Sequence, residues 1–162
     1  MSTEVIPSTT IAIPTGGVKV TGIDVTDDSI SIRLNTTIGP IIGVCDADCC
    51  SETWIEDIEG PALGFPCTLL GGHDLDMPDA RDSEEGEPQD RIEFYGLRLH
   101  TSSGDIDIEY RNASNGYYGG SLEWSQAHYY GGVFKQQVPT DNWLSLDEWR
   151  RRKDGGDNLL TN

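Results

Sequence analysis

One stretch of the sequence constrains the fold more than any other. Over residues 105–110, which read D-I-D-I-E-Y, acidic and apolar side chains alternate strictly. Successive side chains of a β-strand point to opposite faces, so this period of two predicts a strand with one buried and one charged face. Residues 91–101 have the character of a second strand, and Ser102-Ser103-Gly104 between them is typical of a hairpin loop. The sequence therefore predicts a hairpin at its centre.

Shorter segments of the same kind lie on both sides of this hairpin. Residues 18–25 alternate with a break in phase at Gly22, which predicts a β-bulge. Residues 30–34 alternate again. Further strands are expected over residues 41–45, 54–58 (where a single helical turn is the alternative), 65–70, 117–124 and 129–138. We therefore expect a mainly β fold, an antiparallel sandwich or a partly open barrel, with one β domain at residues 17–138.

The two ends of the chain differ from this β domain. Residues 1–16 hold Pro7 and Pro14 among Ser and Thr residues, and we expect an extended N-terminal arm. Residues 139–162 form a C-terminal tail with one short helix at 146–153, because S-L-D-E at its start is a capping box.

Charge sets limits on the partners. The chain has 28 acidic and 11 basic residues and a net charge of −17. Eight acidic residues lie within residues 74–90, where we expect an acidic loop. Nucleic-acid affinity comes largely from Lys and Arg, so DNA and RNA are not expected partners, and anionic membranes are disfavoured for the same reason. A basic protein remains a favourable partner.

No targeting or membrane-spanning segment is expected. No run approaches the ~18 apolar residues that a transmembrane helix needs. The first residues, M-S-T-E-V-I-P, lack the basic and apolar regions of a signal peptide. We therefore expect synthesis in the cytoplasm.

A cysteine cluster offers the one candidate metal site. Cys45, Cys49 and Cys50 lie among acidic residues, and Cys67 is a further candidate ligand, with His73 close by in sequence. Thiolates bind zinc well, but the spacing is not that of a zinc finger or ribbon. Three interpretations stay open: buried thiols at a strand end with no cofactor, a zinc site, or a disulfide or reactive thiol.

Catalytic motifs are not found, so we expect a protein that is not an enzyme. Aromatic residues near the C-terminal half are instead candidates for partner binding, because Tyr and Trp supply contact area at low entropic cost. These candidates are Tyr117, Tyr118, Tyr129, Tyr130, Trp143 and Trp149. The alternative is that they pack on the chain's own core.

Three elements resemble a family of small uncharacterised proteins, many of them encoded by phages. They are D-C-C-S-E at 48–52, I-E-D-I at 55–58 and S-N-G-Y-Y at 114–118, and the resemblance spans roughly residues 18–125. The chain departs from the family pattern at Ser51, which separates the paired cysteines from Glu52, and at Cys45, where the family tends to have His. The resemblance implies a phage origin and a compact β-rich domain, and it implies no activity.

Three functions are consistent with these observations. The leading expectation is a non-enzymatic virion component, a capsid decoration or a minor head or tail protein, that binds other phage structural proteins in a larger assembly. The first alternative is an acidic intracellular inhibitor of a host defence or nucleic-acid-handling protein. The second alternative is a small metal-binding domain that uses Cys45, Cys49 and Cys50.

Overall fold

The fold is known from a computed structural model. It describes residues 3–5, 12–47, 51–77, 81–82, 91–114, 119–126 and 141–156. Strands dominate these residues, so the predicted mainly β class is confirmed. The strands are β1 (Thr3–Val5), β2 (Ala12–Pro14), β3 (Val18–Thr26), β4 (Ser31–Thr36), β5 (Ile41–Ala47), β6 (Glu52–Glu59), β7 (Cys67–Leu75), β8 (Arg81–Asp82), β9 (Arg91–Thr101), β10 (Gly104–Ser114), β11 (Gly120–Gln126) and β12 (Trp143–Ser145). They are followed by helix α2 (Leu146–Arg151) and one wider helical turn, η1 (Arg152–Gly156).

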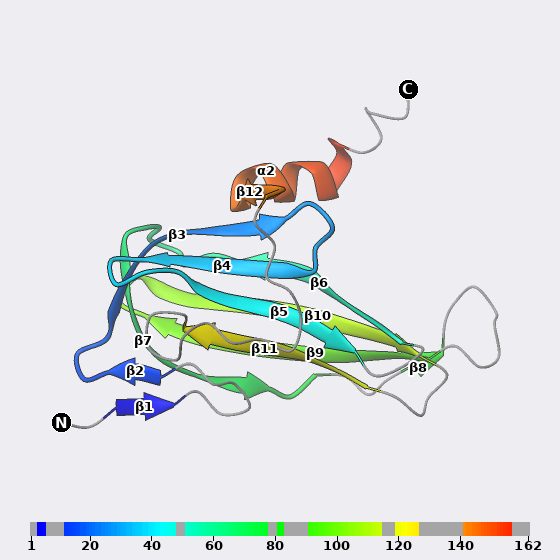
Figure 1. The fold of residues 1–162 in the computed structure, drawn as a ribbon, viewed down its shortest axis with the longest axis horizontal. Helices are drawn as coiled ribbons and strands as arrows, with labels where there is room; N and C mark the ends of the chain where they lie inside the picture. Colours follow the sequence, from blue (N-terminus) through cyan, green and yellow to red (C-terminus); the bar gives the residue numbers. More distant parts are fainter. Residues whose placement is uncertain are drawn as a thin grey trace.

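One antiparallel sheet holds nearly all of these strands (Figure 1). Its order is β11-β5-β4-β3-β7-β9-β10-β6, with β12 added to β3 and β8 to β9. The outermost strands, β11 and β6, do not pair with each other, so the sheet is not closed into a barrel. The predicted antiparallel, mainly β class is confirmed, with a sheet that is not closed into a barrel.

The sheet folds over so that its two halves cover one core. Strands β11, β5, β4 and β3 form one layer, and β7, β9, β10 and β6 form the other. The layers are joined along one seam, where Val18–Val20 of β3 pair with Cys67–Leu69 of β7. Apolar side chains from both layers form a single buried cluster, which includes Ile32, Leu34, Ile55, Ile58, Leu69, Leu97, Leu99 and Ile106.

The predicted central hairpin is confirmed. Strands β9 and β10 pair without a shift from Gly104 opposite Thr101 to Ser114 opposite Arg91. Ile106 and Ile108 are buried in the core, as the alternation requires. The bulge is confirmed as well, because the register of β3 against β4 shifts between Val20 and Gly22.

Other segments differ from the prediction in extent. Residues 52–59 form a full strand, β6, because Thr53, Ile55 and Ile58 find buried positions beside β10. Strand β7 runs on to Leu75, and Arg81–Asp82 pairs with β9, so parts of the predicted acidic loop 74–90 are strand. The predicted strand at 129–138 lies outside the described residues.

The N-terminal residues also differ from a single extended arm. Thr3–Val5 pairs with Ala12–Pro14 in a separate two-stranded sheet (Figure 1). Ile13 is buried and belongs to the core cluster, which gives this segment an apolar anchor. Pro14 is the last residue of β2 and lies outside the main sheet, as its missing N–H favours.

The C-terminal helix forms where the capping motif predicts it. The Ser145 hydroxyl accepts a hydrogen bond from the Glu148 N–H at 3.2 Å. The Glu148 carboxylate pairs with Arg151 and Arg152 in the last turn of the helix. No described helix is long and apolar enough to cross a membrane.

Two side chains dock this short helix on the chain's own sheet, beside β3. Leu146 and Trp149 are buried, and Trp149 is only 3% exposed. The indole Nε1 of Trp149 donates a hydrogen bond to the Ser29 hydroxyl at 2.9 Å, in the turn between β3 and β4. A helix of this length is marginal alone, so these contacts hold it in place.

We predict that Trp149→Ala lowers the free energy of unfolding by about 3–5 kcal/mol, because it removes a large buried aromatic side chain. Trp149→Phe keeps most of the apolar contact and loses the hydrogen bond to Ser29, so its cost should be smaller, about 0.5–1.5 kcal/mol. Urea unfolding followed by circular dichroism measures both. Leu63→Ala, at a side chain that is 83% exposed, serves as the control. Equal stability of Trp149→Ala and this control would contradict the docking.

Candidate functional site

Acidic side chains oppose each other across strands β6 and β10. In the antiparallel register Asp107 lies opposite Glu59, and Glu109 lies opposite Asp57. All four belong to the outer face of the sheet, since their neighbours Ile58 and Ile108 are buried in the core. Like charges placed directly opposite each other destabilise a sheet. We call Asp57, Glu59, Asp107 and Glu109 the acidic face.

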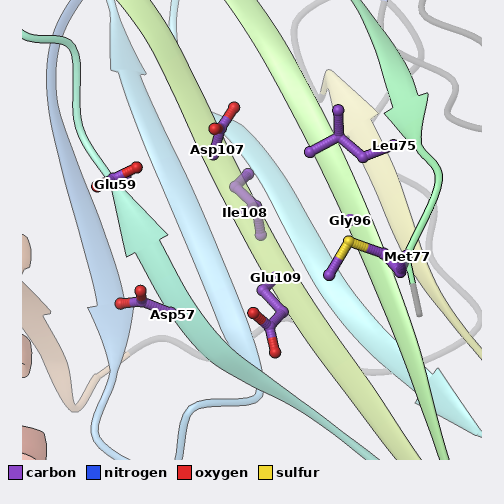
Figure 2. A pocket seen from close by; sticks show the side chains of 8 residues that line it. All are labelled: Asp57, Glu59, Leu75, Met77, Gly96, Asp107, Ile108 and Glu109. Carbon is purple, nitrogen blue, oxygen red and sulfur yellow. The ribbon is translucent and has the colours of Figure 1, made fainter. Parts of the chain in front are cut away.

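The acidic face borders an open hollow (Figure 2). The hollow measures about 220 Å³ and is completed by Gly96 of β9 and by Leu75 and Met77 at the end of β7. Gly96 has a steric reason to be glycine, because a Cβ there would lie 2.7 Å from the Met77 sulfur. The hollow thus has carboxylates on one side and apolar side chains on the other.

Two of the four carboxylates are held by arginines on the same surface. Arg98 of β9 donates two hydrogen bonds, of 2.8 and 2.9 Å, to the Asp107 carboxylate. The Arg98 Nε also lies 3.5 Å from an Asp105 carboxylate oxygen. Arg111 pairs with Glu109 at 2.6 Å. The other two, Asp57 and Glu59, have no cation within ion-pair distance among the described residues.

The pairing of Arg98 with Asp107 affects the protonation of both groups. The hydrogen bonds from Arg98 hold the pKa of the Asp107 carboxyl below its ordinary value. The same bonds raise the pKa of the Arg98 guanidinium, which stays charged throughout the ordinary pH range. Asp107 is therefore an ionised member of the acidic face at neutral pH.

The chemistry of this face suits a positively charged side chain. Small-molecule pockets usually have volumes of about 300–1,000 Å³, and the hollow is smaller and open. A Lys or Arg side chain has an apolar stem that fits against Leu75 and Met77 and a charged head that fits carboxylates. The acidic face can therefore bind a cationic group of another protein.

The candidate metal ligands Cys45 and Cys67 are both buried in the core, at 4% exposure. Burial, with a smaller contribution from Asp28, raises the pKa of the Cys45 thiol to about 12. His73 is exposed on the outer face, whereas Cys67 of the same strand is buried. Among the described residues no three His, Cys, Asp or Glu side chains come together to hold a metal ion. Cys49 and Cys50 lie outside those residues, so the cysteine site stays a prediction.

The predicted partner-binding aromatic residues lie in different environments. Trp149 is buried in the chain's own core and anchors α2. Trp143 of β12 is half-buried, and the Arg33 guanidinium lies 4.4 Å from the centre of its ring. Tyr117, Tyr118, Tyr129 and Tyr130 lie outside the described residues, and their role stays a prediction.

The described residues of the three sequence elements lie on or beside the pair β6–β10. Residues 55–58 are the centre of β6, and Glu52, the last residue of the first element, lies opposite Ala113, just before Ser114 of the third. Buried Asn112 connects β10 to the first element, since its side-chain N–H groups donate to the hydroxyls of Ser51 at 3.2 Å and Thr53 at 3.0 Å. The acidic face lies on the same two strands.

Sequence reasoning did not find the acidic face. The alternation over 105–110 places Asp107 and Glu109 on an outer face, and that signal is visible in the sequence. Nothing local in the sequence identifies β6 as the neighbour that brings Asp57 and Glu59 opposite them. The pairing joins residues about 50 positions apart and depends on the whole sheet.

We predict that the double variant Asp57→Asn, Glu59→Gln is more stable than the natural chain. Removing these two charges relieves the repulsion opposite Glu109 and Asp107, for a gain of roughly a few tenths of a kcal/mol per pair. Urea unfolding at low salt, where the repulsion is strongest, measures the gain. A loss of stability would contradict our account of the acidic face.

A second prediction concerns pH. Because the pKa of Asp107 is lowered in the folded chain from the ordinary 3.8, its ion pair stabilises the fold above about pH 4 and the stabilisation is lost as pH falls below that. Asp107→Asn should therefore be less stable than the natural chain at pH 6, and the difference should shrink by pH 2.5. Arg98→Gln should remove the same pH dependence. A difference that does not change with pH would be inconsistent with the pairing.

Comparison with known proteins gives a family and no function. Neither the curated proteins nor the solved structures contain a match to the chain. A model of the DUF7448 family, described as a domain of unknown function, matches residues 17–124, which include the core of the sheet and both strands of the acidic face. The chain therefore belongs to the DUF7448 family.

Proposed function

We propose that this protein is not an enzyme and acts by binding a basic segment of another protein on its acidic face. The observation that carries the proposal is the two pairs of opposed carboxylates on β6 and β10, of which Asp57 and Glu59 have no cation within ion-pair distance among the described residues. Carboxylates that lie directly opposite each other cost stability in the free chain. A partner that supplies the missing positive charge removes that cost.

A protein partner fits this face better than the other classes of ligand. The hollow beside the acidic face is small for a small-molecule site, at about 220 Å³. The net charge of −17 repels nucleic acid. Lys and Arg side chains match both sides of the hollow, and complementary charge speeds the encounter of two proteins.

The biological setting that we propose is a phage particle. The resemblance of residues 48–52, 55–58 and 114–118 to a largely phage-encoded family supports it. In this setting the chain is a virion component, a capsid decoration or a minor head or tail protein, made in the host cytoplasm and assembled on other phage structural proteins. The aromatic residues of the 117–130 region are proposed as further contacts.

A second candidate is an inhibitor of a basic host protein, such as a defence or nucleic-acid-handling protein. The acidic face is the specific observation that favours it, because its charges gather on two neighbouring strands. The two candidates share the same binding chemistry and differ in the partner and in where the chain is found.

We predict that a labelled peptide of alternating Arg and Ser binds the natural chain in a salt-sensitive manner. The variant Asp57→Asn, Glu59→Gln should bind roughly five- to tenfold more weakly, because two carboxylate contacts are lost. The control is Asp141→Asn, Asp154→Asn, which makes the same change in net charge at exposed residues of the C-terminal segment. Fluorescence anisotropy measures the affinities. Equal weakening in both variants would mean that binding follows net charge alone, against the proposal.

The proposed phage setting is tested separately from the binding chemistry. Mass spectrometry of purified particles should detect the chain in a fixed ratio to the major capsid protein if it is a virion component. Its absence from particles, together with face-dependent binding to a basic host protein in infected cells, would replace the virion role with the inhibitor.

A further inference from the structure

Beyond the acidic face, two histidines and an aspartate form a hydrogen-bonded chain on the outer surface. His100 Nδ1 lies 3.0 Å from an Asp105 carboxylate oxygen, and His100 Nε2 lies 3.0 Å from His73 Nδ1. The two ring centres are 4.9 Å apart. The side chains of His100 and Asp105 are 44% and 43% exposed, so solvent and ions reach them.

The register of three strands builds this chain. His100 of β9 lies opposite Asp105 of β10 and, on its other side, opposite Gly71 of β7. Gly71 has no side chain, and the His100 ring makes its contact with His73, two residues further along β7. A shift in register between Leu69 and Gly71 sets this alignment. The contact is thus fixed by well-paired strands rather than by a loop.

The geometry of the two rings resembles one half of a metal site. Zinc binds histidine nitrogens at about 2.0–2.1 Å with tetrahedral angles, which places two ligand nitrogens about 3.3 Å apart. The facing nitrogens of His73 and His100 are already 3.0 Å apart, so the distance between them needs to grow by only a few tenths of an ångström. The two rings also have to rotate so that both nitrogen lone pairs point at the ion instead of one nitrogen facing the other. Metal-binding histidines also commonly donate their other ring N–H to a carboxylate, and His100 Nδ1 lies where it can do so to Asp105.

We propose that His73 Nδ1 and His100 Nε2 together bind a divalent transition-metal ion such as Zn²⁺, with Asp105 as a positioning residue. The proton of the neutral His73 ring then resides on Nε2, so no proton is lost when the ion binds to the two neutral rings. The described residues supply no third metal-binding side chain, so water molecules complete the coordination and the site stays open to an outside ligand.

Charges around the pair are compatible with a bound cation. Asp105 and Asp107 both lie on the neighbouring strand, and the field of both histidines acts on Asp107. Arg98 lies opposite His73 in the strand register, and its guanidinium is engaged by the carboxylates of Asp107 and Asp105. The inference does not rest on the proposed function, because it uses neither Asp57 nor Glu59.

The test uses the full chain and follows each histidine ring by side-chain ¹H–¹⁵N NMR during titration with Zn²⁺. The chain has three histidines, so the signals are assigned with His73→Gln, His100→Gln and His128→Gln. Ring-resolved signals separate this site from zinc bound by thiols. We expect the His73 and His100 signals to shift together before one equivalent is added, and the His128 signal to stay unchanged.

Variants then measure what each group contributes. Loss of either ligand, in His73→Gln or His100→Gln, should weaken Zn²⁺ binding at the remaining ring at least tenfold. Asp105→Asn should weaken it roughly ten- to a hundredfold and change the ¹⁵N shift of His100 Nδ1, which reports the tautomer. His128→Gln should bind as the natural chain does, and circular dichroism verifies that each variant is folded.

Three results would overturn the proposal. The first is that neither the His73 nor the His100 ring responds to one equivalent of Zn²⁺. The second is unchanged affinity at one ring when the other is replaced. The third is an equal response to Mg²⁺, which prefers oxygen ligands and would report only attraction to the acidic surface.

Discussion

The register in which β10 pairs with β9 and β6 is the constraint on which the rest of the structure depends. Side chains alternate between faces along a strand, so a slip of one residue would expose Ile106 and Ile108 and bury the acidic residues between them. Burial of the apolar face therefore selects one register. That register in turn decides which charged side chains meet on the other face.

The arrangement of charged side chains on the outer face follows from this register. That arrangement is not the most stable one for the free chain. Arg98 and Arg111 form ion pairs with two of the four opposed carboxylates, and the charge of Arg98 also attracts Glu59 at longer range. Asp57 and Glu59 themselves form no ion pair among the described residues, and each lies opposite a like charge. Both the acidic face and the histidine pair lie on strands that are hydrogen-bonded on each side or pack on the core, so their geometry is well defined before any partner arrives.

Local patterns predicted the local parts of this fold well. The hairpin at 91–110, the bulge near Gly22 and the Ser145 cap each depend on neighbouring residues and are where the sequence indicates. Contacts between segments distant in the sequence could not be predicted from local patterns. The meeting of His73 with His100 depends on one extra residue in β7, and an offset of this size leaves no mark in an apolar–polar pattern.

The two layers of the sheet are held together mainly by packing. Backbone pairing between them is limited to Val18–Val20 with Cys67–Leu69, with one further hydrogen bond from the Ile55 N–H to the Ser29 carbonyl among the described residues. Apolar attraction has no preferred direction, whereas a hydrogen-bonded ladder fixes its partners in discrete steps. The spacing and angle of the layers therefore follow the shapes of the side chains between them, and a change of volume in the core would tilt one layer against the other while leaving each ladder intact.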